Sequence, residues 1–161
     1  MIVVVSDTSP VRALAHLNHL DLLHRLFDSI LVPPAVEHEL RLPPSRLVPV
    51  DVSQIPFMVV QKPRDRDQVH QFLKALDPGE SEALALALET EASAILMDER
   101  AGRSVASHHG IPVVGTLGIL LRAKNRGMIP ALRPLVDRLI AELGFFISAV
   151  LFEEILRRAN E

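Results

Sequence analysis

Short apolar runs alternate along the chain with longer segments in which apolar residues recur every three or four positions. The runs are mostly aliphatic and lack period-two alternation, which is typical of strands buried on both faces of a sheet. They lie at residues 2–6, 30–32, 57–62, 94–99 and 111–115. The intervening segments have the spacing of helices that pack on a sheet. This order predicts an α/β fold: a single-domain three-layer sandwich in which helices flank a central, mostly parallel sheet of four to five strands.

Polar residues at the expected helix starts predict where the helices are capped. Thr8 or Ser9 is predicted to cap the first helix, with Pro10 in its first turn. Thr116 is similarly predicted to cap the helix that follows the last strand. With Thr8 and Ser9 available for capping, Asp7 is expected to be free for another role.

The length of 161 residues suits one compact domain with a sizeable core, so residues 1–161 are predicted to form a single domain. Two helices, at about 131–143 and 148–159, form a C-terminal helical extension, residues 131–161. Their apolar positions suit packing on the domain or on a partner.

Composition narrows the class of protein. With 48% hydrophobic residues and no apolar run of about 18 residues, we expect a soluble protein without a membrane partner. No export signal is recognisable at the amino terminus, so the cytoplasm is the predicted location. The absence of cysteine excludes disulfides, zinc ribbons and thiol nucleophiles, and leaves oxygen or imidazole as the ligands of any metal.

The formal net charge of −3 is not that of a protein that coats nucleic acid electrostatically. The chain has no Trp, no Tyr and only six Phe, and so offers few platforms on which bases could stack. A passive nucleic-acid-binding module is therefore disfavoured.

Two acids stand where apolar runs end. Asp7 follows the run at residues 2–6, and Asp98 comes directly after Met97. Ligands of open parallel sheets bind outside the carboxyl ends of the strands, so two parallel neighbouring strands would bring these carboxylates to one edge. The alternative for either residue alone is a helix cap or an Asx turn. As a pair, they favour a functional site.

Two glutamates on predicted helices are candidates to join them. Glu39 borders the apolar face of its helix, whereas Glu37 points away. Glu80 stands in the first turn of the apolar helix after the Pro-Gly pair, and helical angle does not choose between Glu80 and Glu82. The alternative for each is a solvated face or a favourable charge near a helix N-terminus.

Four converging carboxylates would repel one another unless cations lay between them. Mg²⁺ and Mn²⁺ prefer carboxylate and water oxygens, and a bound ion would remove that repulsion. A site of this kind suits phosphodiester hydrolysis, in which the metal polarises a phosphoryl oxygen and activates a water for in-line attack.

The order of motifs resembles the PIN-domain ribonucleases. The segments that carry the resemblance are "DTSPVRALAHL", "LDPGESEALALALE", "ILMDERAGRSVA", "VVGTLGILLRAKNRGMI" and "GFFISAVLFEEIL". They look like an uncharacterised PIN-like branch described as predicted nucleic-acid-binding proteins, and the likeness covers nearly all of the chain. It implies the PIN-like fold, Mg²⁺ or Mn²⁺ as cofactor, and cleavage of single-stranded RNA. It also implies a homodimer and, frequently, the toxin of a toxin-antitoxin pair, with a small antitoxin protein as partner.

Matched position by position, the resemblance implies four catalytic and metal-binding acids. These are Asp7, Glu39, Glu80 and Asp98. The hydroxyl that often follows the first acid of the family matches Thr8 or Ser9, which would bind substrate. Many relatives have Asp in place of Glu80, and many carry a threonine two residues before the fourth acid, where this chain has Leu96.

Two arginines and two other classes of function complete the sequence-based hypotheses. Arg100 and Arg103 follow Asp98 and are candidates to contact substrate phosphate, the alternative being a solvated helix face. The second hypothesis is a catalytically silent PIN-like protein that acts by binding protein or nucleic acid. The third is a phosphatase that forms an aspartyl phosphate on Asp7, although such enzymes carry a second Asp where this chain has Ser9.

Overall fold

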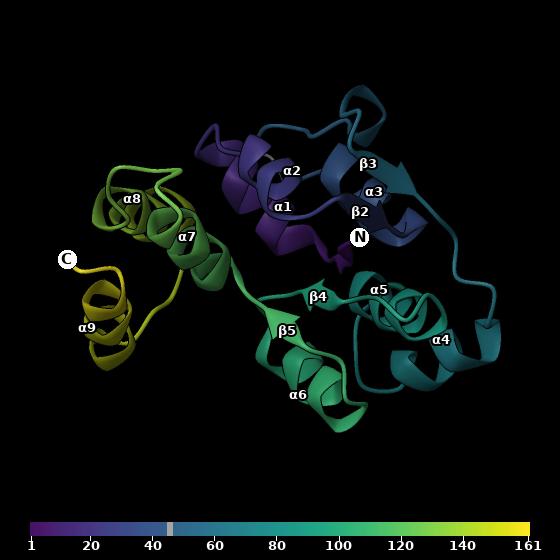
Figure 1. Ribbon diagram of the computed structural model, residues 1–161. Helices are drawn as coiled ribbons and strands as arrows, with labels where there is room; N and C mark the ends of the chain where they lie inside the picture. Colours follow the sequence, from purple (N-terminus) through teal and green to yellow (C-terminus); the bar gives the residue numbers. More distant parts are fainter. Residues whose placement is uncertain (45–46) are drawn as a thin grey trace.

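The computed structural model describes residues 1–44 and 47–161, and its centre is a five-stranded sheet (Figure 1). The strands are β1 (Val3–Ser6), β2 (Ser29–Val32), β3 (Met58–Val60), β4 (Ala94–Leu96) and β5 (Val113–Val114). Their order across the sheet is β3-β2-β1-β4-β5, and every neighbouring pair is parallel. The predicted α/β fold is thus confirmed, and the sheet is parallel throughout.

Helices cover both faces of this sheet. They are α1 (Thr8–His16), α2 (Asp21–Leu26), α3 (Pro34–Arg41), α4 (Arg66–Leu73), α5 (Pro78–Glu89), α6 (Arg100–His108), α7 (Thr116–Asn125), α8 (Arg133–Leu143) and α9 (Ala149–Arg158), with a short 3₁₀ turn at Val52–Gln54. Figure 1 shows α4, α5 and α6 on one side of the strands and α1, α2 and α7 on the other. The predicted three layers are therefore present.

Side chains of the strands alternate between two hydrophobic cores, which explains why the strands read as continuous apolar runs. Val4 of β1 packs in the core with α1, α2 and α7, whereas its neighbour Val5 packs in the core with α4, α5 and α6. Leu96 and Met97 divide in the same way at the end of β4. Successive strand residues point to opposite faces, so both faces must be apolar when helices cover both.

The register of the central strands aligns their carboxyl ends. Ser6 of β1 lies opposite Leu96 of β4, and the backbone N–H of Asp7 donates to the Leu96 carbonyl at 2.9 Å. Asp7 and Asp98 therefore leave the sheet at the same edge, from adjacent strands.

The C-terminal helices pack against the chain's own core. Leu132 and Val136 of the α8 region and Ile155 of α9 are buried in the core beneath α7. The last residue, Glu161, accepts hydrogen bonds from the backbone N–H groups of Leu132 at 2.6 Å and Arg133 at 3.1 Å. Its carboxylate also lies 3.3 Å from Lys124 Nζ of α7, so the end of the chain is held at three points.

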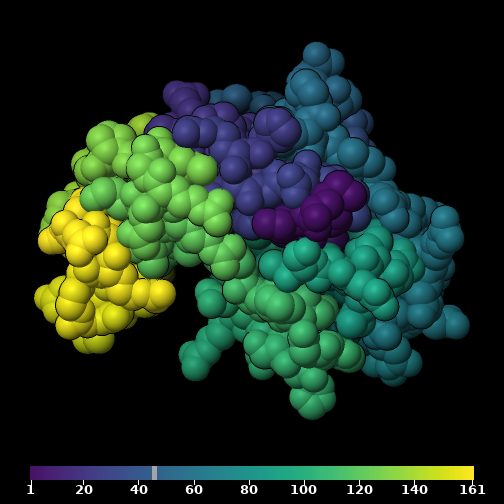
Figure 2. Space-filling model, in the orientation of Figure 1, coloured from purple at the N-terminus to yellow at the C-terminus, as the bar shows by residue number. Residues whose placement is uncertain are grey.

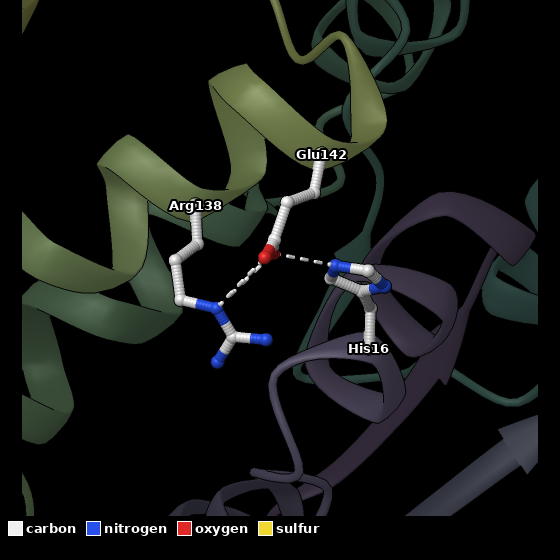
Figure 3. Close-up of polar contacts among 3 residues, drawn as sticks. All are labelled: His16, Arg138 and Glu142. Carbon is white, nitrogen blue, oxygen red and sulfur yellow. Dashed lines mark hydrogen bonds and ion pairs between the residues drawn. The ribbon is translucent and has the colours of Figure 1, made fainter.

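A polar contact joins α8 to α1 (Figure 3). Glu142 of α8 lies 2.9 Å from a ring nitrogen of His16, the last residue of α1, and accepts a hydrogen bond of 3.1 Å from Arg138. The hydrogen bond to His16, with the nearby Arg138 guanidinium, holds the pKa of Glu142 below its usual value.

The predicted caps of two helices are wrong. The N-cap position of α1 is Asp7 rather than Thr8 or Ser9, and that of α7 is Gly115 rather than Thr116. The three hydroxyls lie inside their helices and donate to carboxylates from other elements. Cap preferences are local, and acceptors supplied by the tertiary structure compete with them.

Within residues 1–44 and 47–161, every helix is too short or too polar to cross a membrane.

Candidate active site

A cavity of about 280 Å³ opens at the carboxyl edge of the sheet, above β1 and between α1, α3 and α5. Five carboxylates line it: Asp7, Glu39, Asp77, Glu80 and Glu99. Thr8, Ser9 and Arg12 of α1 complete the polar lining. Three of the four predicted acids thus share one cavity.

Asp7 lies at the base of this cavity and is 4% exposed. Burial raises the pKa of Asp7 to about 7, although a hydrogen bond from the backbone N–H of Thr8 opposes the shift. The carboxylates of Asp77, Glu39 and Asp98 raise it further. Asp7 makes no side-chain cap to α1, so its carboxylate remains available to the cavity.

Glu80 faces Asp7 from the first turn of α5. Burial, followed by the charges of Asp77 and Asp7, raises the pKa of Glu80 to about 8. Packing separates Glu80 from Glu82: Glu80 lines the cavity, whereas the Glu82 carboxylate lies 3.8 Å from the Arg66 guanidinium. Glu82 also accepts a weak hydrogen bond of 3.4 Å from the Ala35 N–H.

Glu39 reaches the cavity from α3 and is held there by α1. Its carboxylate accepts a hydrogen bond from the Thr8 hydroxyl, and its backbone carbonyl accepts one of 2.8 Å from Arg12 Nη2. The carboxylate also lies against Gly79 of α5, where a Cβ atom would stand 2.8 Å from Glu39 Oε1. A glycine at this position therefore leaves the room that Glu39 occupies.

Asp98 lies beside the cavity rather than in its lining. It accepts hydrogen bonds from the Thr116 backbone N–H at 2.7 Å, the Thr116 hydroxyl at 2.6 Å and the Ser9 hydroxyl at 2.9 Å. Ser9 lines the cavity, so it links Asp98 to the other acids. Asp98 also stabilises the start of α7, because the N–H it accepts is one that the helix leaves unpaired.

The two candidate arginines differ in position. Arg103 lines a second cavity. Its Nη1 and Asp98 Oδ1 both lie next to Gly115, where a Cβ atom would be 3.3 Å from the first and 3.0 Å from the second. Arg100 is exposed at the start of α6 and is absent from the lining of either cavity.

Three charged residues of the lining escaped the sequence-based prediction: Arg12, Asp77 and Glu99. Arg12 stands four residues after Thr8, and helical spacing alone would have placed both on one face of α1. Asp77 precedes Pro78 and caps α5 by accepting a hydrogen bond of 2.8 Å from the Glu80 N–H. Because a cap explains an Asp at this position, the sequence gives no sign that Asp77 also lines the cavity. Glu99 follows Asp98 directly and carries no separate signal.

Arg12 is the cation of this acidic cavity. Its Nε is buried without a hydrogen-bond partner in the described part of the chain. Burial lowers the pKa of Arg12, and the charge of Glu39 opposes the shift. Arginine remains protonated, so its guanidinium places a positive charge beside Glu39.

The chemistry of the donors fits Mg²⁺ or Mn²⁺, which prefer carboxylate oxygens. Burial and the charges of neighbouring acids raise the pKa of Asp7 and Glu80, and a divalent cation at the site would favour the ionised form of both. Within the described residues, no three His, Asp or Glu side chains already stand in a metal-binding arrangement. Glu39 and Asp98 instead accept hydrogen bonds from Thr8 and Thr116.

A family model described as a PIN domain matches residues 3–161 of the chain. The searches of curated proteins and of solved structures found no match.

Proposed function

Because the chain belongs to the PIN-domain family, we propose that it is a metal-dependent endoribonuclease that hydrolyses phosphodiester bonds of single-stranded RNA. Proteins of this family are generally nucleases, so membership supports the hydrolase class. The proposed catalytic acids and metal ligands are Asp7, Glu39, Glu80 and Asp98.

One observation carries the proposal: three acids from separate elements meet in one cavity at the carboxyl edge of a parallel sheet. Asp7, Glu39 and Glu80 come from the β1–α1 junction, α3 and α5. Burial first, and then the charges of neighbouring acids, raises the pKa of both Asp7 and Glu80. Such an arrangement opposes stability unless a cation or a substrate uses it, which favours function.

Mg²⁺ or Mn²⁺ held by these acids would supply Lewis-acid polarisation of the phosphoryl oxygen and an acidified water. The chain's own groups would orient the substrate. The hydroxyls of Thr8 and Ser9 line the cavity and would donate to phosphate oxygens, and the Arg12 guanidinium would offer a charge-assisted hydrogen bond. In the structure the Thr8 and Ser9 hydroxyls donate to Glu39 and Asp98, so each would exchange that acceptor for a phosphate oxygen when substrate binds.

The same proposal includes the biological setting of a toxin-antitoxin pair. The protein would act as the toxin, as a homodimer in the cytoplasm, with a small antitoxin protein as its inhibitor. Expression that arrests growth, with relief by a protein encoded next to it, would support this role. Unaffected growth on expression of active enzyme would count against it.

A second candidate is a catalytically silent PIN-like protein. The observation that favours it is the engagement of Glu39 and Asp98 by hydroxyl groups, together with the lack of a ready metal-binding arrangement among the described residues. In that case RNA would remain intact whatever metal is added. The phosphatase hypothesis is not carried further, because Ser9 donates to Asp98 and supplies no second acid.

The direct test compares cleavage of a labelled single-stranded RNA by the wild-type protein and by Asp7→Asn. We expect cleavage with Mn²⁺ or Mg²⁺, none with EDTA, and a loss of at least about 100-fold in the variant, because one transition-state charge partner is removed. Asp137→Asn is the matched control, since Asp137 is exposed on α8 and far from the cavity lining. Equal cleavage by wild type and Asp7→Asn, or cleavage unaffected by EDTA, would refute the assignment.

A further inference from the structure

A second cavity of about 850 Å³ adjoins the candidate site. Residues of β5 and α7 line one side of it, and the Leu143–Phe146 segment with Leu151, Ile155 and Arg158 lines the other. Figure 2 shows the surface hollowed beside the C-terminal helix, drawn in yellow. We call this cavity the α7–α9 groove.

The groove and the acidic cavity are continuous. Ser9, Glu99, Leu143 and Phe145 line both of them. A polymer cut at the acidic cavity must extend beyond it, and the groove begins where that cavity ends. By its position, the groove therefore offers a path for the polymer on one side of the bond that is cleaved.

The groove carries charges of both signs. Its acids, Asp98 and Glu99, lie at the end shared with the candidate site. Arg103, Arg122 and Arg158 come from α6, α7 and α9 and provide the positive charge. Within residues 1–44 and 47–161, none of these three arginines lies within 4 Å of a carboxylate.

The outer wall of the groove also exposes apolar surface. Phe146 is 89% exposed and Leu151 is 45% exposed, although nearby Ile155 is buried. Unpaired guanidinium groups beside an exposed aromatic ring match a strand of nucleotides, whose phosphates attract arginine and whose bases stack on aromatic faces.

A second copy of the chain matches the groove less well. A two-fold symmetric interface brings the same patch of both subunits together. In such a pair each groove would contribute three arginines and only two acids among its described lining residues, whereas a polyanion supplies a phosphate for each arginine. Charge therefore favours a polyanion over self-association at this face.

We propose that the α7–α9 groove binds the single-stranded RNA next to the scissile phosphate. Arg103, Arg122 and Arg158 contact its phosphates, and the ring of Phe146 stacks on a base. This inference rests on the proposed function, because it takes RNA as the substrate of the adjoining site. It makes the C-terminal extension part of the substrate-binding surface.

The first experiment measures binding without cleavage. A labelled 12-nucleotide single-stranded RNA is titrated with Asp7→Asn protein in EDTA, alone and with Arg122→Gln or Arg158→Gln added. We expect each arginine variant to weaken binding about three- to tenfold and to reduce the slope of log affinity against log salt by about 0.7. Arg64→Gln removes the same charge at an exposed residue outside the groove and should change neither quantity.

The second experiment uses substrate length. In the Mn²⁺-loaded enzyme, Arg122→Gln and Arg158→Gln should raise KM for the 12-nucleotide RNA while leaving a trinucleotide unaffected, because the trinucleotide does not extend into the groove. Phe146→Leu keeps an apolar side chain but removes the ring, and should weaken binding of the long RNA by a similar factor.

The outcomes separate this proposal from the proposed function. RNA binding that depends on the groove arginines, without any cleavage, would leave the groove standing and refute the nuclease. Cleavage with equal KM for the arginine variants and Arg64→Gln would leave the nuclease standing and refute the groove. A change in sedimentation of the Phe146→Leu variant from dimer to monomer, with RNA affinity unchanged, would assign the face to a second copy and overturn the proposal.

Discussion

The acids of the candidate site differ in what neutralises their charge. Asp98 accepts three hydrogen bonds, two of them from Thr116, and resembles a structural carboxylate. Asp7 and Glu80 differ from Asp98. Burial raises the pKa of both, and the charges of neighbouring acids raise it further. An acid that is costly to ionise and lines a cavity is a candidate for function. On this criterion Asp7 and Glu80 are the first residues to test.

Glu80 and Glu82 form a matched pair for mutation, since they stand two residues apart on α5. Glu80→Gln should lower the cleavage rate at least tenfold, because Glu80 lines the cavity. Glu82→Gln should leave cleavage unchanged, since Glu82 pairs with Arg66. Single-turnover cleavage of one RNA by both variants checks the prediction. The reverse order of effects would make Glu82 the third acid.

Asp7 also predicts a dependence of stability on pH in metal-free protein. Its folded pKa of about 7 lies above its ordinary value of 3.8, so the folded state binds the extra proton between these values. The contribution of Asp7 to the free energy of unfolding should therefore fall as pH rises from about 4 to about 7 and then level off. Asp7→Asn removes this penalty and should be about 4 kcal/mol more stable than wild type at pH 8, with little gain at pH 4.

Urea unfolding in EDTA, followed by circular dichroism at several pH values, measures this difference. Added Mn²⁺ should stabilise the wild-type protein and have little effect on Asp7→Asn. An Asp7→Asn protein less stable than wild type at pH 8 would show that Asp7 has a structural role instead.

Among the elements, α5 contributes most to the site through its first turn. Asp77 caps it, Pro78 occupies the first turn and Gly79 leaves space for the carboxylate of Glu39. Glu80 then faces Asp7. A single helix start therefore supplies one acid and accommodates another from α3.

Gly79→Ala tests this use of space. The added methyl would meet Glu39 Oε1 at 2.8 Å, so Glu39 must move away from Thr8. Cleavage should fall about tenfold, whereas stability should hold, because Ala favours a helix over Gly by about 1 kcal/mol. Cleavage assays and thermal unfolding of the same sample check both parts. Unchanged cleavage would mean that the position of Glu39 is unimportant.

Ser81→Ala is the control for changes in this turn. The Ser81 hydroxyl is buried without a hydrogen-bond partner in the described part of the chain, so its removal should be neutral or stabilising by about 1 kcal/mol. Cleavage should match wild type. A large loss of stability would instead indicate a partner for this hydroxyl.

In the molecule as a whole, the C-terminal extension is attached to the rest of the domain through its last residue, and it also helps to form a cavity. The Glu161 carboxylate joins the end of the chain to the start of α8 and to α7. The same extension provides one wall of the α7–α9 groove. Overall net charge is −3, yet acids gather in one cavity and unpaired arginines in the other.

Glu161→Gln tests this attachment. Partial burial alone would raise the pKa of Glu161, but hydrogen bonds from the Leu132 and Arg133 N–H groups and the Lys124 charge lower it. A lowered folded pKa adds stability that is fully present above the ordinary value of 4.5 and is lost as pH falls through the folded value. The variant should lose about 0.5 kcal/mol at pH 7, a figure reduced for solvent screening, and almost nothing at pH 3.

Denaturant unfolding at both pH values checks this, with Glu153→Gln, an exposed residue of α9, as the control. Equal losses in the two variants would show that net charge, and not the attachment at Glu161, sets the effect.

The sequence by itself determined the elements, the parallel α/β class and the approach of two acids. Apolar periodicity is a local consequence of which faces are buried, so it marks strands and helices before their neighbours are known. Asp7 and Asp98 could be placed at one edge because strands of a parallel sheet end at the same side. Glu39 is a candidate because it borders the apolar face of its helix, whereas only the family motifs favour Glu80, since helical angle leaves Glu80 and Glu82 equal.

Only the tertiary structure decided which side chains meet. Packing of α5 beside α3 places Glu80 in the cavity and Glu82 against Arg66. Local preference predicted helix caps for Thr8 and Thr116, whereas both donate to carboxylates supplied by other elements. The α7–α9 groove forms because α9 lies across from α7 in the folded chain. The apolar pattern of each helix does not show which other helix it will lie beside. Contacts between distant segments depend on how helices and sheet pack as a whole, and local patterns do not encode that.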